Sequence, residues 1–227
     1  AVSLSGDIAD QAAVREAVAW GAELIVLKGD LTHHGREHEW ELLRGLLDDI
    51  PVPVAVMIGN HETYHLGRRR DRAGRADGAG RADQADRAGR EQRLHPHKAL
   101  ADLRQPYAPV TWVDVPGARV LLADTTVPAT GRGRVERSVH DAVVEAASAS
   151  PAPVVLMLHH HLERLPVPVV YPFGVAWPGA VRLLRALRAA NPAVFVTSGH
   201  SHRNRARVQY GVRITEVDGH RHVSTLI

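Results

Sequence analysis

The stretch Leu24-Ile25-Val26-Leu27-Lys28-Gly29-Asp30 decides how the rest of the chain is interpreted. Its first four residues are apolar, and such a short and uninterrupted run is typical of a strand buried on both faces of a sheet. The run ends in a glycine and an aspartate, so a carboxylate stands just beyond the strand. In α/β proteins, sites lie beyond the carboxyl ends of strands, and we therefore expect a functional site at this edge.

The same arrangement occurs three more times along the chain. Strands are predicted at residues 52–58, 154–158 and 193–197, and they are followed by Gly59-Asn60-His61, His159-His160-His161 and Gly199-His200-Ser201-His202. Apolar residues at helical spacing predict helices at residues 10–20, 36–49, 95–104, 138–149 and 178–190. Hairpins are expected at residues 112–123 and 205–217. Strands that alternate with helices predict an α/β layered fold, and the hairpins indicate that part of the sheet is antiparallel or mixed.

Length and composition are those of one globular domain, which we expect to span residues 1–227. The chain is 44% hydrophobic and 23% charged, and it contains no cysteine, which excludes disulfides and thiolate metal sites. A reducing, cytoplasmic location fits this composition. No apolar run is long enough to span a membrane and the first residues lack the pattern of a signal peptide, so we expect neither feature.

The positive charge of the chain is concentrated in one insert, at about residues 67–94. Between residues 68 and 93 there are nine arginines against four aspartates and one glutamate, and the rest of this segment is mainly alanine and glycine. Without apolar periodicity, such a segment is predicted to be a low-complexity surface loop. The net charge of +3 therefore does not indicate a basic domain surface, and we do not expect nucleic acid as a partner. Binding of an acidic partner by the insert is the alternative.

The residues that follow the predicted strands are of metal-ligand type. The convergence of strand ends would bring together Asp30, Asn60, His159, His200 and His202. Carboxylate, amide oxygen and imidazole together suit manganese, iron or zinc, whereas magnesium and calcium prefer oxygen alone. One carboxylate can bridge two ions, so a site for two metal ions is predicted. The alternative is that Asp30 caps a turn and that Asn60 and His61 form an ordinary turn pair.

These four blocks, in this order, closely resemble the calcineurin-like metallophosphoesterase family, and they are most similar to its cyclic-nucleotide phosphodiesterase-type branch. The resemblance extends from about residue 7 to residue 217, apart from the arginine-rich insert. It implies a four-layer α/β/β/α sandwich of two mixed sheets flanked by helices, which we expect to be incomplete at both ends.

The resemblance also implies roles for individual residues. Asp30 would bridge the two metals, Asn60, His159 and His200 would bind the second metal, and His202 would bind the first. His61 would lie near the phosphate as general acid or transition-state stabiliser, oriented by an acidic neighbour. A small phosphomonoester or phosphodiester would be hydrolysed by a metal-bound hydroxide. For the two histidines after His159, we expect His160 to line the pocket and His161 to be solvated.

One departure from the family pattern concerns the first metal. The family carries an Asp-X-His block at the end of its first strand, and the only candidate here is Asp7-Ile8-Ala9, with Ala9 in place of the histidine. Either the chain is truncated and lacks its first strand, or this tripeptide is a degenerate remnant. Both explanations leave Asp30 and His202 as the clear ligands of the first metal. The alternative function is therefore a weak or inactive metal-binding or interaction module.

Overall fold

The computed structural model describes residues 2–4, 11–66, 93–103, 107–162, 174–201 and 205–216. The helices are α1 (Gln11–Ala19), α2 (Glu37–Asp48), α3 (Asn60–Thr63), α4 (Pro96–Asp102), α5 (Arg137–Ser148) and α6 (Trp177–Ala190), with a 3-10 turn at Tyr64–Leu66. The strands are β1 (Val2–Leu4), β2 (Ile25–Lys28), β3 (Val54–Met57), β4 (Val110–Val115), β5 (Ala118–Ala123), β6 (Val154–Leu158), β7 (Val194–Ser198), β8 (Arg205–Gln209) and β9 (Val212–Glu216).

The strands form two sheets. One has three described strands in the order β1-β2-β3, and both of its pairings are parallel. The other has six described strands in the order β4-β5-β6-β7-β9-β8. It is mixed, because the hairpins β4-β5 and β8-β9 are antiparallel while β5, β6, β7 and β9 run parallel.

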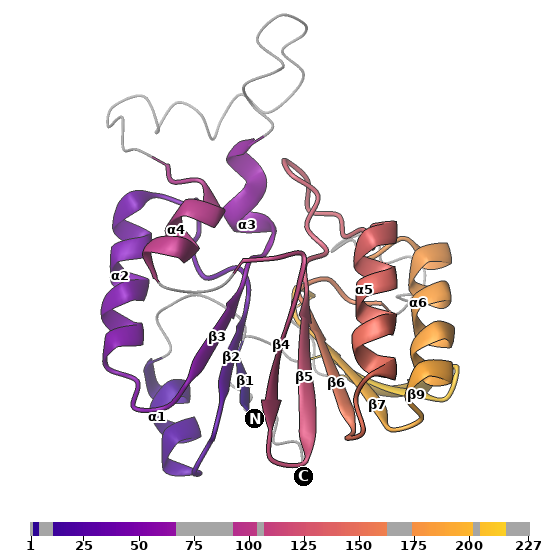
Figure 1. Ribbon diagram of the computed structural model, residues 1–227. Coiled ribbons are helices and arrows are strands. Elements are labelled where there is room, and N and C mark those ends of the chain that lie inside the picture. Colours follow the sequence, from indigo (N-terminus) through magenta and orange to yellow (C-terminus); the bar gives the residue numbers. More distant parts are fainter. Residues whose placement is uncertain are drawn as a thin grey trace, which may run out of the picture.

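The two sheets lie face to face with helices on their outer sides, as Figure 1 shows. Alternate residues of each strand point to opposite faces of a sheet. In β2, Ile25 belongs to the apolar cluster beneath the helices, whereas Val26 belongs to the cluster between the sheets. In β6, Leu156 likewise packs toward α5 and α6, whereas Val155 and Met157 face the other sheet. The fold is therefore a four-layer α/β/β/α sandwich, as predicted from the sequence.

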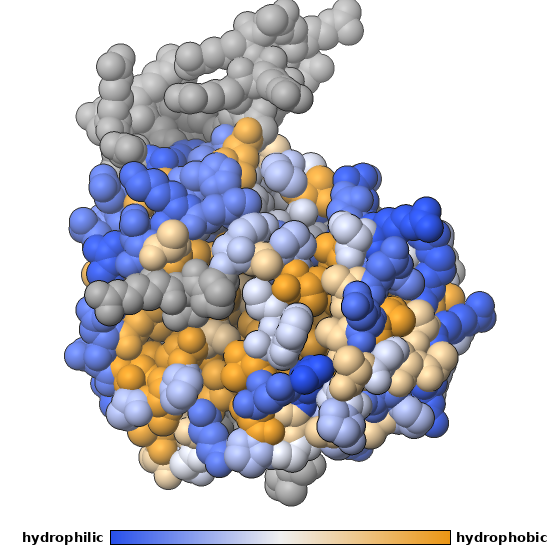
Figure 2. Space-filling view, in the orientation of Figure 1, coloured by the Kyte–Doolittle hydropathy of each residue, from blue (hydrophilic) through white to orange (hydrophobic). Residues whose placement is uncertain are grey.

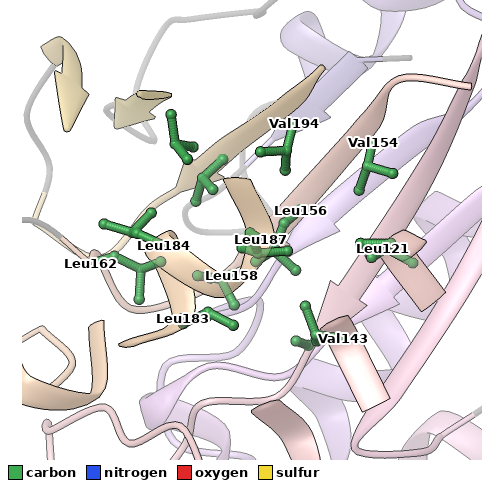
Figure 3. Close-up of a cluster of buried hydrophobic side chains, with 14 of the residues drawn as sticks. Leu121, Val143, Val154, Leu156, Leu158, Leu162, Leu183, Leu184, Leu187 and Val194 are labelled. Carbon is green, nitrogen blue, oxygen red and sulfur yellow. The ribbon is translucent and has the colours of Figure 1, made fainter. Parts of the chain in front are cut away.

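The larger of the two outer cores is shown in Figure 3. There Val143 of α5 and Leu183 and Leu187 of α6 pack on Leu121 and Leu156 of the six-stranded sheet, and all five are fully buried. In Figure 2 the hydrophilic residues cover the flanks formed by the helices, and apolar residues show between them. No helix in the described ranges is long and apolar enough to cross a membrane.

Most predicted elements are confirmed within one to three residues at each end. The exceptions are short: α3 and the 3-10 turn were not predicted, and neither was β1. β1 pairs in parallel with β2, with Val2 opposite Ile25, so a described strand precedes β2 in the sheet. Asp7-Ile8-Ala9 and nearly all of the arginine-rich insert lie outside the described residues, so the predictions about them stay predictions.

Candidate metal centre

Four of the predicted site residues stand where strands of the two sheets end. Asp30 is two residues past β2 and Asn60 is three residues past β3, both in the three-stranded sheet. His159 directly follows β6 and His200 is two residues past β7, in the six-stranded sheet. The strands in each pair are parallel and in matched register, with Lys28 opposite Met57 and Leu158 opposite Ser198, so their carboxyl ends lie at one edge.

The side chains of Asp30, Asn60 and His200 converge on one atom of the fourth residue, Nε2 of His159. That nitrogen lies 2.9 Å from Asn60 Oδ1, 3.2 Å from His200 Nδ1 and 3.3 Å from Asp30 Oδ2. Asn60, His159 and His200 are buried, and the side chain of Asp30 is 15% exposed. The structure therefore brings together four residues that lie as far apart in the sequence as positions 30 and 200.

This arrangement fits a cation. Nδ1 of His159 lies 2.9 Å from the carbonyl oxygen of Lys28, which can only accept, so Nδ1 carries a proton. In the neutral ring, Nε2 then presents a lone pair to the amide oxygen of Asn60 and to a carboxylate oxygen of Asp30. Lone pairs that face one another repel unless a positive charge lies among them. The amide nitrogen of Asn60 is buried with no hydrogen-bond partner among the described residues, so the oxygen carries the contacts of this side chain.

The electrostatics of the site also favour positive charge. Burial raises the pKa of the Asp30 carboxyl, but the neighbouring His159 and His61 lower it by more, so it falls below its usual range. Burial lowers the pKa of His159, but the Asp30 carboxylate and the hydrogen bonds of the ring raise it by more. Burial, together with the charge of His159, lowers the pKa of His200 to about 3. The imidazole of His200 is therefore neutral near pH 7, which is the form that binds metals.

Two glycines let the loops of the three-stranded sheet approach each other. Gly29 has φ +85°, and a Cβ at this position would lie 2.6 Å from the backbone nitrogen of Gly59. A Cβ at Gly59 would in turn lie 2.8 Å from Cε1 of His159. Asp30 itself has φ 54°, a left-handed conformation that aspartate tolerates better than most residues. The backbone is therefore shaped to hold Asp30 and Asn60 against His159.

The buried carboxylate of Glu62 fixes both loops. Its Oε2 accepts from the backbone nitrogens of Gly59 at 2.7 Å and Asp30 at 3.0 Å. Its Oε1 accepts from the backbone nitrogen and the hydroxyl of Thr32, at 2.7 and 3.0 Å. Burial and the nearby Asp30 raise the pKa of Glu62, although the hydrogen bonds to its oxygens oppose the shift. Sequence reasoning missed this role, and the available signal was the three-residue spacing of Gly59 and Glu62, which is that of a helix N-cap and its N3 residue.

Lys28 joins the two sheets beneath the site and was also missed. Its ammonium group is fully buried and donates to the carbonyl oxygen of Ser198 at 2.9 Å and to the hydroxyl of Thr197 at 3.2 Å. Burial lowers the pKa of Lys28 to about 7, and the charge of Glu216 opposes that shift. Because the carbonyl oxygen of Lys28 also accepts from His159, this residue contacts the ends of both β6 and β7. A lysine that directly continues an apolar strand was the only sequence signal.

His61 lies beside Asp30 and is partly open to solvent. Its backbone nitrogen donates to Asp30 Oδ1 at 3.0 Å, and its Nε2 lies 3.9 Å from Asp30 Oδ2. Its Nδ1 lies 3.2 Å from the carbonyl oxygen of His33, and 31% of its side chain is exposed. The adjacent acid, Glu62, faces backbone nitrogens instead of the His61 ring. The ring is thus held by a carbonyl oxygen, with Asp30 as the acidic residue nearest to it.

The two histidines that follow His159 are both buried. The prediction that His161 is solvated is wrong, because its exposed fraction is only 2%. Its ring is covered by the backbone of Gly174, and its Nδ1 lies 3.8 Å from Glu216 Oε1. Burial and the charge of Arg205 lower the pKa of His161 to about 4. Gly174 and Val175, which enclose it, follow more than ten residues later, so the residues next to His161 could not indicate this burial.

His160 belongs with His159 and His200 in one buried group. The three residues offer ligand atoms that lie within 4.8 Å of one another, so this group could hold a metal ion. Burial, followed by the neighbouring His159 and His200, holds the pKa of His160 well below its usual range, so its ring is neutral. His202, the residue predicted for the first metal, lies outside the described residues.

Solved structures share this fold. A purple acid phosphatase from yellow lupin (Lupinus luteus) seeds is similar, with a TM-score of 0.63 and 14% identity over 96% of this chain. The chain spans only 43% of that phosphatase. GAP50, the anchor in the inner membrane complex of Plasmodium, is similar with a TM-score of 0.51 and 12% identity, over 96% of this chain and 70% of GAP50. At these identities the likeness shows the fold alone.

Sequence comparison identifies the family. No curated protein matches the chain significantly. The model of the calcineurin-like phosphoesterase family, by contrast, matches residues 6–204. That range holds all four blocks that follow the strands, and it includes Asp30, Asn60, His159 and His200. This chain therefore belongs to the calcineurin-like phosphoesterase family.

Proposed function

We propose that this protein is a metal-dependent phosphoesterase that hydrolyses a phosphomonoester or a phosphodiester. The observation that carries the proposal is the convergence of Asp30, Asn60 and His200 on Nε2 of His159, at 2.9 to 3.3 Å. A carboxylate, an amide oxygen and two imidazoles form a mixed ligand set, which suits manganese, iron or zinc better than magnesium or calcium.

These four residues would hold one ion, and Asp30 with His202 would be the clear ligands of a second. When bound, such ions polarise phosphoryl oxygens and lower the pKa of a water molecule, which makes a nucleophile available at neutral pH. The contribution of the chain itself is a rigid frame. Glu62 fixes the loops that carry Asp30 and Asn60, and Lys28 fixes the ends of β6 and β7 relative to them.

His61 is the residue that we propose as general acid. Its Nδ1 faces the carbonyl oxygen of His33, which orients the ring, and its Nε2 lies on the side of Asp30. With about a third of its side chain exposed, the ring can reach a phosphoester bound at the mouth of the site and give a proton to the leaving oxygen. Because it is not among the converging ligands, replacing it should impair turnover more than metal binding.

The substrate belongs to the small phosphoesters, and the sequence blocks favour the cyclic-nucleotide phosphodiesterase-type branch. Cyclic nucleotides are accordingly the first class to test, followed by other nucleotides and phospholipid headgroups. The chain spans less than half of the lupin phosphatase, so nothing about its substrate is inferred from that similarity.

Hydrolysis of p-nitrophenyl phosphate and bis(p-nitrophenyl) phosphate, measured with added Mn²⁺, Fe²⁺ or Zn²⁺, tests the proposal. We expect turnover that is lost in Asp30→Ala and in Asn60→Ala, because each variant removes a converging ligand. In His61→Ala, turnover should fall by about 10²–10⁴-fold while the metal content stays near that of the parent. His140→Ala, on the outer side of α5, is the matched control and should retain activity. A folded chain that binds metal but hydrolyses neither compound would contradict the proposal.

The alternative is a metal-binding or interaction module with weak or no turnover. It is favoured by one specific observation, the alanine at position 9 in place of the histidine of the first metal-ligand block. Elemental analysis of bound metal, combined with the hydrolysis assay above, distinguishes the two functions. The alternative predicts about one ion per chain and no hydrolysis, whereas two ions at high occupancy would contradict it.

A further inference from the structure

The imidazole of His160 is a buried polar group beside the metal site, and the proposed function gives it no role. Its exposed fraction is 0%, and its Nε2 has no hydrogen-bond partner among the described residues. A buried nitrogen without a partner destabilises a fold, so such groups are rare in native proteins unless a ligand or ion satisfies them. The ring therefore needs an explanation other than packing.

The position of the ring points to the same ion as His159 and His200. The ring centroids of these three histidines lie 4.7, 4.8 and 5.0 Å apart, in a nearly equilateral triangle. Their ligand atoms lie within 4.8 Å of one another. Two nitrogens that bind one ion at about 2.1 Å can be no more than about 4.2 Å apart, so shifts of a few tenths of an ångström would place all three around a common centre.

The other ring nitrogen is held by Thr125, which follows β5. Nδ1 of His160 lies 3.0 Å from Thr125 Oγ1, and the same oxygen accepts from the backbone nitrogen of His160 at 3.4 Å. When Nδ1 donates to this hydroxyl, the lone pair of the ring is on Nε2. Hydrogen bonds of this kind fix the tautomer and orientation of metal-binding histidines. The backbone of Gly133 covers the ring, because a Cβ at that position would lie 2.6 Å from Cγ of His160.

We propose that Nε2 of His160 is a third imidazole ligand of the ion held by His159 and His200, and that Thr125 is the positioning residue that orients it. This inference rests on the metal site of the proposed function, but not on turnover. With Asp30 and Asn60, the site would present three nitrogens and two oxygens to a single ion. Such a set selects zinc, cobalt or nickel over magnesium and calcium. It would also allow one ion to bind tightly without the ligands of the first block.

Metal binding to the full chain, freed of metal with a chelator, tests this inference without any substrate. X-ray absorption of the parent chain loaded with a single equivalent of Zn²⁺ should report about three imidazoles, and Co²⁺ titration followed by visible absorption gives the affinity. In His160→Gln we expect about two imidazoles and an affinity for Co²⁺ that is lowered by about 100-fold. In the parent chain, Mg²⁺ should not compete with Co²⁺ for the site. Thr125→Val should lower the affinity by about 10-fold and Thr125→Ser should restore it.

The matched control is His161→Gln, because that neighbouring ring is equally buried but lies outside the group, with its centroid 6.4 Å from that of His200. Its affinity for Co²⁺ should equal that of the parent. The inference is overturned if the parent chain binds Zn²⁺ through only two imidazoles, or if it binds no Zn²⁺. The first of these results needs no variant, so a folding defect in His160→Gln cannot obscure it. Three imidazoles in a chain without phosphoesterase activity would contradict the proposed function and leave this inference standing.

Discussion

Thr32 donates both its backbone N–H and its hydroxyl to one oxygen of Glu62, Oε1, at 2.7 and 3.0 Å. The second oxygen of the same carboxylate accepts from the backbone of Asp30 and Gly59. Four donors from two loops therefore end on one buried side chain. A carboxylate is the side chain that can satisfy them, because it has only acceptor sites.

Replacing Glu62 by glutamine should therefore destabilise the chain and weaken the metal site. Glutamine presents an NH₂ group to backbone donors, so buried N–H groups lose their partner. We expect the free energy of unfolding to fall by about 3 kcal/mol in Glu62→Gln and by about 1 kcal/mol in Thr32→Val. Urea unfolding in the presence of a chelator measures both. Glu41→Gln, on the exposed side of α2, should change stability by less than about 0.5 kcal/mol. Equal stability of the two glutamine variants would refute the role given to Glu62.

A second prediction separates close approach of the loops from backbone strain. Gly21 and Gly29 both have positive φ, at +76° and +85°, but a Cβ at Gly21 meets nothing within 4 Å. Gly21→Ala should therefore cost only the strain of the left-handed conformation, about 1 kcal/mol. Gly29→Ala also forces the loops of Asp30 and Asn60 apart, and we expect a loss of about 3 kcal/mol. Thermal unfolding and Zn²⁺ titration should show a weaker metal site in Gly29→Ala alone.

The strands and the four converging residues could be predicted because their signals are local. An apolar run that stops at Gly29-Asp30 indicates both the strand and the side chain beyond it, and parallel strands place their ends at one edge. The same logic applies to Asn60, His159 and His200. The residues next to each of these positions were sufficient to predict a strand that ends in a polar side chain. The fold class then implied that the four side chains converge.

The features that escaped prediction depend on contacts between distant segments. Lys28 is buried because Ser198, 170 residues away, supplies an acceptor for its ammonium group. His161 is buried because the backbone of Gly174 covers it. Glu62 faces backbone nitrogens rather than His61, because the loop that carries Asp30 approaches it from another strand. No pattern within a short stretch of sequence encodes which loops approach each other, so these side chains were assigned wrong environments or none.

The pair of Tyr107 and Asp124 should give the protein a distinctive pH dependence. The Tyr107 hydroxyl donates to Asp124 Oδ2 at 2.8 Å, and burial, followed by the charge and hydrogen bond of Asp124, raises the pKa of Tyr107. The unfolded chain loses this proton near the usual value of about 10, whereas the folded chain keeps it. Stability contributed by the pair is therefore complete below that pH and is lost as the pH rises above it.

Absorbance of ionised tyrosine during alkaline titration measures this shift. One of the four tyrosines of the chain should ionise later than the others, and Tyr107→Phe should remove that late step. The variant should also show a weaker decline in the free energy of unfolding above pH 10 than the parent. A titration of Tyr107→Phe that keeps the late step would assign the shift to another tyrosine.

The remnant hypothesis for Asp7-Ile8-Ala9 predicts a gain of metal from a single substitution. Ala9 stands where the family carries a histidine, and Asp30 and His202 alone are too few ligands to hold a first ion tightly. Ala9→His would add an imidazole, and we expect bound metal to rise from about one ion per chain to about two. Ala9→Leu adds bulk without a ligand atom and should leave the content at about one ion per chain. Because two ions can orient a phosphoester and its nucleophile together, hydrolysis of bis(p-nitrophenyl) phosphate should rise with the second ion. Unchanged metal content in Ala9→His would mean that this tripeptide is not the counterpart of the first metal-ligand block.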